Sequence, residues 1–422
     1  MNTTFSTFFR NGFIALVFLL FPSFLTDILI VKSGISISMG RLGIFAILGL
    51  LASFSLLNAK LSDLQKRILL LYFISIIYLC VIWAFSTPGY FEGNGPRMII
   101  KHLIMGGMLM IVMNDSRMDI IGLSKFLTYV AFILAALSII QYFGYSYGFI
   151  SLSMQSLPMY EGQRLLGMGG FIDPSRTDYM YGIPYRNIGF FSEPTNFAQF
   201  LQIPLFLALL RYMRERKVRN LFVVLVIAGA FCLTFSVANF FGLLVVLIIM
   251  QYYMRDKSKR VTGLGVVAGF AGLIAACYAL YVLYDTTNKY DYNSEMVIGK
   301  NTFVTVLNRF ARTDIVFNAL GNNPFGNIGF AREYATNPGL IGNVAITGGF
   351  PLILMMGLLF GKYYATIYGA LKSSRNKLAY IGCFSYLVPF LWDGQFYELY
   401  FLFTVAFFSA LVKHEMAGGE IM

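Results

Sequence analysis

Residues 186–200 read RNIGFFSEPTNFAQF, the end of a polar loop followed by the start of an apolar helix. Pro194 suits the first turn of a helix, and the acidic Glu193 beside it is favoured by the helix dipole. The apolar residues that follow predict that this helix enters a membrane, with Arg186 and Glu193 at its surface. A carboxylate at the mouth of a membrane helix is costly, which points to function; simple helix capping is the alternative.

The composition of the whole chain is that of a membrane protein. Its 422 residues are 58% hydrophobic and 12% charged, and its mean hydropathy is +0.69. A soluble domain carries about 25% charged residues. The formal net charge of +12 would suggest nucleic acid in a soluble protein. In a membrane protein, the enrichment of lysine and arginine in cytoplasmic loops explains this positive charge better, and no nucleic-acid partner is expected.

Apolar runs long enough to cross a bilayer recur from end to end, so we predict an all-α, polytopic fold with 1–422 as a single integral membrane domain. Ser236 is taken as a break within the long apolar stretch 220–253, because Ala238 and Asn239 allow a tight turn. The twelve expected transmembrane helices are about 13–31, 42–58, 68–86, 98–113, 126–144, 194–210, 220–235, 237–253, 262–284, 346–366, 378–393 and 395–411.

Lysine and arginine counts predict the orientation of these helices. If the N-terminus is cytoplasmic, the short outer loops hold only Lys32, Arg41 and Arg97. The cytoplasmic segments hold nineteen lysines and arginines: Arg10, Lys60, Lys66, Arg67, Arg117, Lys125, Arg211, Arg214, Arg216, Lys217, Arg219, Arg255, Lys257, Lys259, Arg260, Lys372, Arg375, Lys377 and Lys413. Because cytoplasmic loops carry the excess of positive residues, both termini are expected in the cytoplasm.

Two outer loops, at about 145–193 and about 285–345, are much longer than the other connections. Loops of this length are usually functional, and short helices lying on the membrane are expected in both. The guanidinium fork pairs bidentately with phosphate oxygens, so outward-facing arginines predict a phosphate site. For any single arginine, the alternative to a phosphate-binding role is a solvated charge paired with a nearby acidic residue. The arginines concerned are Arg164, Arg176, Arg186, Arg309 and Arg312.

Sequence motifs for nucleotides and metals are missing. The chain has no Walker-type phosphate loop and no dinucleotide fingerprint. Its only histidines are His102, in an expected span, and His414, in the C-terminal tail. The outer loops contain no acidic pair separated by one residue, so the expected chemistry needs neither a metal nor another cofactor.

Three groups of residues carry a family resemblance over roughly 180–365. They are Arg186, Gly189, Phe190, Glu193, Pro194 and Ala198; Leu233-Thr234-Phe235-Ser236; and Arg312, Ala319-Leu320, Pro324, Gly326, Gly329, Asn337, Leu340 and Gly348-Gly349. In this order they resemble the bacterial O-antigen polymerase (Wzy-type) family, which is related to O-antigen ligases and C-type membrane glycosyltransferases. The chain differs from the family in two ways. Val237 stands where the family commonly has an arginine, and Gly326 and Gly329 are one residue further apart than is usual in the family. Ligases of this superfamily rely on a histidine in the large outer loop as their base. The expected outer loops of this chain contain no histidine, so the polymerase assignment is preferred.

The resemblance implies a polysaccharide polymerase in the bacterial inner membrane. It would transfer a growing glycan from undecaprenyl diphosphate onto a lipid-linked repeat unit at the outer face. Arg186, Arg309 and Arg312, with Arg164 and Arg176, would hold the diphosphate and stabilise its charge as it leaves. Glu193, or failing it Asp314, would take the acceptor proton; alternatively Glu193 only orients Arg186. Besides membrane lipid, a chain-length regulator protein is an expected partner.

Three other functions stay open from the sequence. A lipid-linked oligosaccharide flippase or another transporter would also suit twelve spans and basic outer residues. A transporter, however, should bury charges at the membrane midplane and show paired halves with broken helices, and no such similarity between halves is found. The other two are a ligase-like glycan transferase and an assembly protein without catalysis.

Overall fold

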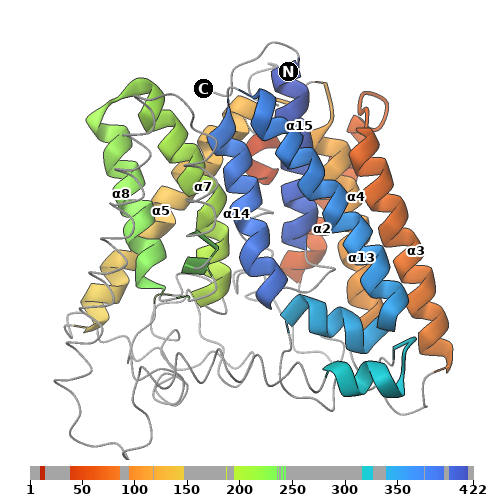
Figure 1. The fold of residues 1–422 in the computed structure, drawn as a ribbon. Coiled ribbons are helices and arrows are strands. Elements are labelled where there is room, and N and C mark those ends of the chain that lie inside the picture. The colour runs from red at the N-terminus through yellow and green to blue at the C-terminus, as the bar shows by residue number, and fades with distance from the viewer. Residues whose placement is uncertain are drawn as a thin grey trace, which may run out of the picture. The chain divides into compact units, whose positions relative to one another are not determined.

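The described part of the chain is helical. The computed structural model describes residues 10–14, 39–85, 95–116, 118–146, 187, 194–234, 236, 239–240, 242–243, 316–326, 339–374, 376–393 and 399–416. Besides a short helix at 316–322, the longer helices within these ranges are α2 Met39–Ser55, α3 Asp63–Phe85, α4 Gly95–Met113, α5 Ile120–Ser146, α7 Pro194–Glu215, α8 Val218–Leu233, α13 Gly339–Ser373, α14 Lys377–Asp393 and α15 Leu399–Met416 (Figure 1).

Three of these helices are long and apolar enough to cross a membrane. The qualifying segments are Asp63–Ile82 of α3, Ile120–Ile140 of α5 and Val344–Leu371 of α13. Each exposes large apolar side chains at helical spacing, such as Leu70, Phe73 and Ile77 on α3. Contiguous apolar stripes of this kind are unfavourable in water, whereas lipid tails cover them without cost.

Each of the longer helices overlaps a span expected from the sequence, while span 262–284 and most of 13–31 and 237–253 lie outside the described residues. Two helices extend beyond their expected spans. α13 begins at Gly339, ahead of the expected span 346–366, and its membrane-length apolar segment begins at Val344. α15 continues beyond residue 411 to Met416, and its last turn is held by a 2.9 Å hydrogen bond from Lys413 Nζ to the Asn114 carbonyl oxygen.

The chain divides into two compact units, the first formed by Met1–Asn11, Phe45–Ile120 and Val306–Ile421. In this unit α15 contacts α4, α14 and α3, while α13 packs against α14 and α3. Every α15 residue from Leu402 to Leu411 is buried, as expected for a helix that is apolar on all sides. α15 is therefore the central helix of the first unit.

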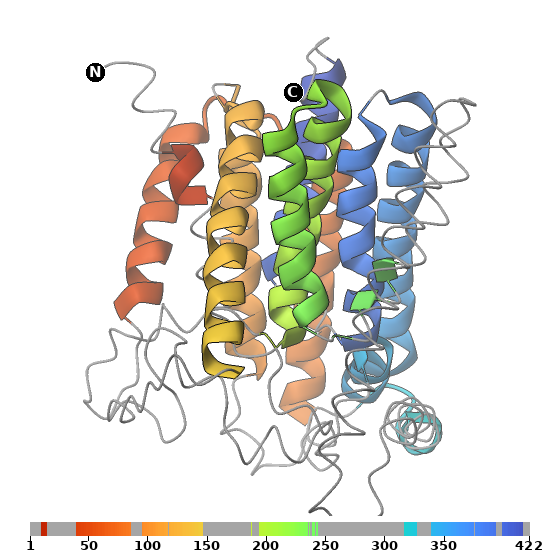
Figure 2. The same ribbon diagram turned by 90° about the vertical axis from the view of Figure 1, so that its left-hand side faces the viewer.

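The second unit comprises Gly12–Ile44 and Ile121–Thr305, with α5, α7 and α8 as its described helices. α7 and α8 are joined by Arg216 and Lys217 and pack side by side as a hairpin (Figures 1 and 2). Residues 197–210 of α7 are all buried, so α7 forms the core of this unit. α5 contacts α8 through the Phe132 and Phe222 rings, whose centroids lie 5.9 Å apart in an edge-to-face arrangement.

Gly106 and Gly107, adjacent residues of α4, provide a matched test of the packing between α4 and α15. A Cβ atom at Gly106 would lie 2.8 Å from Leu402 Cβ, whereas a Cβ at Gly107 would meet nothing within 4 Å. We expect Gly106→Ala to lower the free energy of unfolding by about 1–3 kcal/mol through overpacking. Gly107→Ala should be neutral or slightly stabilising. Unfolding of both variants in detergent measures the difference, and equal stability would contradict this close approach.

Candidate functional site

A network of buried polar side chains joins α5, α7 and the end of α8 in the second unit. One part of the network holds Asn187, which is 5% exposed. The Asn187 backbone N–H donates a 2.9 Å hydrogen bond to the Leu233 carbonyl oxygen at the end of α8. Its side-chain Nδ2 donates to Ser138 Oγ of α5 at 3.1 Å. Asn187 is therefore tied to two helices at once.

Asn239 lies at the centre of the second part of the network and is fully buried. Its Nδ2 donates to the Thr195 carbonyl oxygen at 3.2 Å and to Ser236 Oγ at 2.8 Å. Its Oδ1 accepts a 2.7 Å hydrogen bond from Gln202 Nε2 of α7. Asn239 thus connects the first turn and the middle of α7 to the turn after α8, and it uses all of its donor hydrogens in doing so.

The turn after α8 is closed by its own polar residues. Thr234 Oγ1 donates to the Phe231 carbonyl oxygen at 2.7 Å, which satisfies an acceptor at the helix end. The Phe240 backbone N–H then donates to the Ser236 carbonyl oxygen at 2.9 Å, a helical spacing that starts the next helical residues. The break expected at Ser236 is therefore present, and its residues are bonded into the network.

The network fixes the positions on both sides of segment 188–193. On its N-terminal side Asn187 is bonded to α5 and α8, and on its C-terminal side the Thr195 carbonyl oxygen of α7 accepts from Asn239. Arg186 and Glu193 are sequence neighbours of these two anchors. Most polar atoms of the network are paired, while Gln202 Oε1 is buried without a partner among the described residues. Two anchored residues thus flank segment 188–193 in the sequence.

All seven residues chosen from the sequence as site residues lie outside the described residues: Arg164, Arg176, Arg186, Glu193, Arg309, Arg312 and Asp314. Sequence reasoning missed the residues that form the network, namely Ser138, Asn187 and Gln202, and assigned Asn239 only a turn. The available signal was a buried amide within an apolar helix, as at Gln202. Among the described residues, no group of three or more His, Cys, Asp or Glu side chains is arranged to hold a metal ion.

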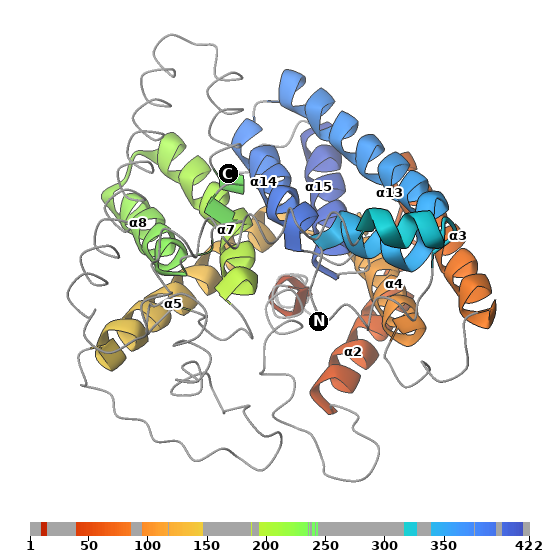
Figure 3. The ribbon, with the colours of Figure 1, turned by 60° about the horizontal axis from the view of Figure 1, so that its bottom comes forward.

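The first unit contains a close contact between helix 316–322 and the kink of α13. Gly349 has φ 61° and ψ −159°, so the chain turns there, and the helix 316–322 lies beside the first segment of α13 (Figures 1 and 3). The Phe350 backbone N–H donates to the Pro324 carbonyl oxygen at 2.9 Å. Tyr78 Oη of α3 lies 2.8 Å from the Phe325 carbonyl oxygen and 3.0 Å from that of Gly348, so one hydroxyl hydrogen serves both acceptors.

Glycine is required at this contact because two backbone segments meet. A Cβ atom at Gly326 would lie 2.5 Å from Gly348 Cα and 2.6 Å from Gly348 N. Gly326 also has a φ of 86°, which disfavours other residues. Pro324, Gly326, Gly348 and Gly349 thus form one backbone junction. Arg312 and Asp314 precede the helix 316–322 by a few residues in the sequence.

Comparison of the chain with protein-family models and with curated proteins finds no match. The functional argument consequently rests on this chain's own residues. Two features of the described structure matter most. One is the buried network that anchors residues 187 and 195 in the second unit; the other is the glycine junction that follows the Arg312 segment in the first unit.

Asn239 offers a direct test of the network. Asn239→Ala leaves Gln202 Nε2 without its acceptor, and a buried unsatisfied polar group costs about 1–3 kcal/mol. We expect the variant to unfold at lower temperature in detergent. Ser53→Ala is the matched control, because exposed Ser53 bonds only the Gly49 carbonyl oxygen of its own helix in the described contacts. Equal unfolding of the two variants would contradict a structural role for the network.

Proposed function

We propose that this protein is a polysaccharide polymerase of the bacterial inner membrane, with about twelve membrane spans and both termini in the cytoplasm. Its product is O-antigen, capsule or exopolysaccharide. It transfers the growing glycan from undecaprenyl diphosphate onto a lipid-linked repeat unit at the outer face. The observation that carries the proposal is the buried network that holds both sides of segment 188–193. Polar side chains inside membrane helices are costly and usually mark a functional region.

In the proposed reaction, the bond between the donor sugar's anomeric carbon and the diphosphate oxygen breaks. A bond from that carbon to the acceptor hydroxyl oxygen forms, and undecaprenyl diphosphate leaves with the bonding electron pair. Arg186, Arg309 and Arg312 stabilise the diphosphate charge as it develops, because guanidinium groups bind phosphate oxygens in pairs. Glu193, or else Asp314, accepts the proton of the acceptor hydroxyl. The donor diphosphate supplies the bond energy, so no nucleotide is consumed.

A general base needs a fixed position, and the anchors at Asn187 and Thr195 support the assignment of that role to Glu193 between them in the sequence. A general base must come within about 2.6–3.2 Å of the proton donor atom in a productive complex. A loop that moved freely would rarely hold Glu193 at that distance. Asn187 and Thr195, six and two residues away from Glu193 in the sequence, are both hydrogen-bonded to buried parts of the second unit. A rigid scaffold under a reactive loop is how membrane and soluble enzymes alike position such groups.

The proposal is tested with the full chain in lipid nanodiscs and a synthetic lipid-diphosphate repeat unit, without nucleotide or added metal. A ladder of products that lengthens with time, resolved on a gel, is the expected result. Absence of a ladder with the native repeat unit, together with transport of that lipid across liposomes, would overturn the proposal in favour of a flippase. Transfer of a single finished glycan onto a different acceptor would instead indicate a ligase.

A further inference from the structure

A second polar cluster lies in the second unit where α7 ends and α8 begins, together with a cavity of about 280 Å³. One part of the cavity wall is polar and includes Arg211, Arg219 and Asn220. Another part is apolar and includes Phe132, Phe222 and Val223. A cavity with one cationic and one apolar side suits an amphiphilic molecule with an anionic head.

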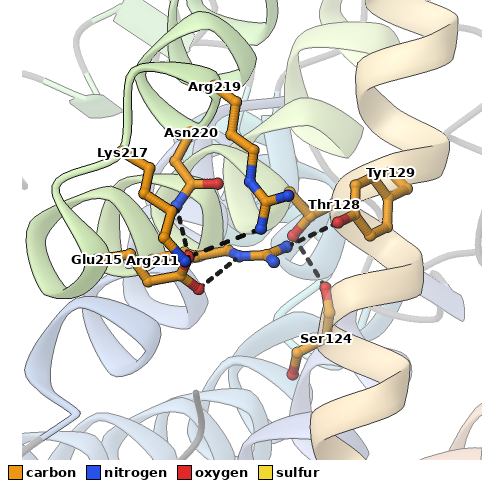
Figure 4. Close-up of polar contacts among 8 residues, drawn as sticks. All are labelled: Ser124, Thr128, Tyr129, Arg211, Glu215, Lys217, Arg219 and Asn220. Atoms are coloured by element: carbon orange, nitrogen blue, oxygen red, sulfur yellow. Dashed lines mark hydrogen bonds and ion pairs between the residues drawn. The ribbon is translucent and has the colours of Figure 1, made fainter.

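The polar residues of the cluster converge on one carboxylate, that of Glu215 (Figure 4). Glu215 Oε1 accepts from Arg211 Nε at 3.1 Å. Glu215 Oε2 accepts from Asn220 Nδ2 at 3.2 Å and lies 3.1 Å from Lys217 Nζ. Arg219 Nη2 is 3.9 Å from the same oxygen, and its side chain is 67% exposed. Both carboxylate oxygens are therefore occupied while Arg219 is held only at long range.

The cluster keeps an excess of positive charge at neutral pH. The hydrogen bond from Lys217, followed by those from Asn220 and Arg211, lowers the pKa of Glu215 to about 2. Glu215 is thus ionised, and it offsets one of the three cations Arg211, Lys217 and Arg219. The surrounding 211–219 segment adds two more arginines and no further acid. An anionic group entering the cavity would complete this charge balance.

Arg211 is rigidly placed at the cavity wall. Its Nη1 donates a 3.0 Å hydrogen bond to Tyr129 Oη of α5, in addition to its bond with Glu215. The guanidinium carbon lies 5.6 Å from the centre of the Tyr129 ring. Arg211 is consequently structural, whereas the exposed side chain of Arg219 is accessible to a ligand. The apolar side is equally accessible, because Phe222 is 57% exposed.

We propose that this cavity binds an anionic phospholipid, with the phosphate at Arg219 and the start of an acyl chain along Phe132, Phe222 and Val223. The 211–219 segment follows the expected span 194–210, which would place it at headgroup depth on the cytoplasmic side. Basic residues there attract anionic lipids at about 1 kcal/mol each. The inference depends on the membrane location of the helices and not on the polymerase reaction.

Native mass spectrometry of the full chain tests this binding. The protein in a non-ionic detergent is mixed with equal amounts of dioleoylphosphatidylglycerol and dioleoylphosphatidylcholine. We expect preferential retention of phosphatidylglycerol, and a fall of about fivefold in its apparent affinity for Arg219→Gln. Val223→Trp should also weaken retention, because it fills the cavity without changing the charge. Lys66→Gln is the control: Lys66 is an equally exposed cation, paired with Asp63 and outside the cavity.

Three outcomes would overturn the proposal. Equal retention of the two lipids would show that charge does not select the ligand. Equal losses for Arg219→Gln and Lys66→Gln would indicate diffuse surface attraction instead of a site. Displacement of the lipid by millimolar inorganic phosphate would show that the cavity binds a free anion. Thermal unfolding of Arg219→Gln should match that of the unsubstituted protein, because this side chain is exposed. A loss of bound lipid in this variant would therefore not result from unfolding.

Discussion

Gly349→Ala is expected to destabilise the protein by about 3–5 kcal/mol, the sum of backbone strain and a backbone clash. The φ of 61° and ψ of −159° at Gly349 belong to a region that only glycine occupies without strain. A Cβ atom there would also collide with the Pro324 carbonyl oxygen and lie 2.6 Å from Gly326 N. The backbone atoms involved cannot rotate away as a side chain would. Chemical unfolding in detergent measures the loss.

Gly357→Ala in the same helix is the matched control. A Cβ atom at Gly357 would meet nothing within 4 Å, and the residue lies inside the regular part of α13. Alanine in a helix interior is favoured over glycine by about 1 kcal/mol, so this variant should be neutral or slightly more stable. Similar destabilisation by Gly357→Ala and Gly349→Ala would contradict the role given to the kink. In Gly349→Ala, proteolysis near 316–326 should also become faster, because the Phe350 to Pro324 bond is lost.

Arg186→Ala and Arg312→Ala are each expected to lower the rate of polymer formation by about 10²–10³-fold. Under the proposed mechanism these guanidinium groups stabilise the departing diphosphate, and each substitution removes a two-pronged contact to it. Lysine at either position should restore only part of the rate, since it keeps the charge but loses the planar fork. The rate of ladder growth with the lipid-diphosphate substrate measures the effect. Membrane insertion should be unchanged.

Lys66→Ala is the control for a lost cation in the polymerase assay. Lys66 and its ion-pair partner Asp63 are both largely exposed, so this change should affect neither stability nor polymer length. Long polymer at normal rate from both arginine variants would refute their assignment to the diphosphate. Because the lipid-binding experiment does not involve these residues, its result would stand in that case.

Much of the helical structure could be predicted from local sequence. In lipid each backbone group must find its partner within the segment, so an apolar run of sufficient length implies a helix. This reasoning located α3, α5 and α13, and Pro194 correctly predicted the first residue of α7. It also predicted a break near Ser236, and α8 ends at Leu233, two residues before the expected end of span 220–235. These features depend on residues close together in the chain.

The residues that join the helices could not be predicted in the same way. Gln202 and Asn239 are 37 positions apart, and Tyr78 and Gly348 are 270 apart. An isolated amide in an apolar helix does not reveal which neighbour it will face. The kink of α13 was not predicted for a related reason: the residue after Gly349 is bonded to the Pro324 carbonyl oxygen, 26 positions earlier in the chain.

The sequence by itself determined the helices, their apolar surfaces and the basic segments between them, because membrane burial and helix capping act over one or a few turns. It also supplied the charged residues on which the proposed chemistry rests. Only the tertiary structure decided that Asn187 and Thr195 are anchored by one buried network. It likewise decided that three cations share Glu215 beside a cavity. Such contacts depend on which helices become neighbours, and that choice is made by packing over the whole unit.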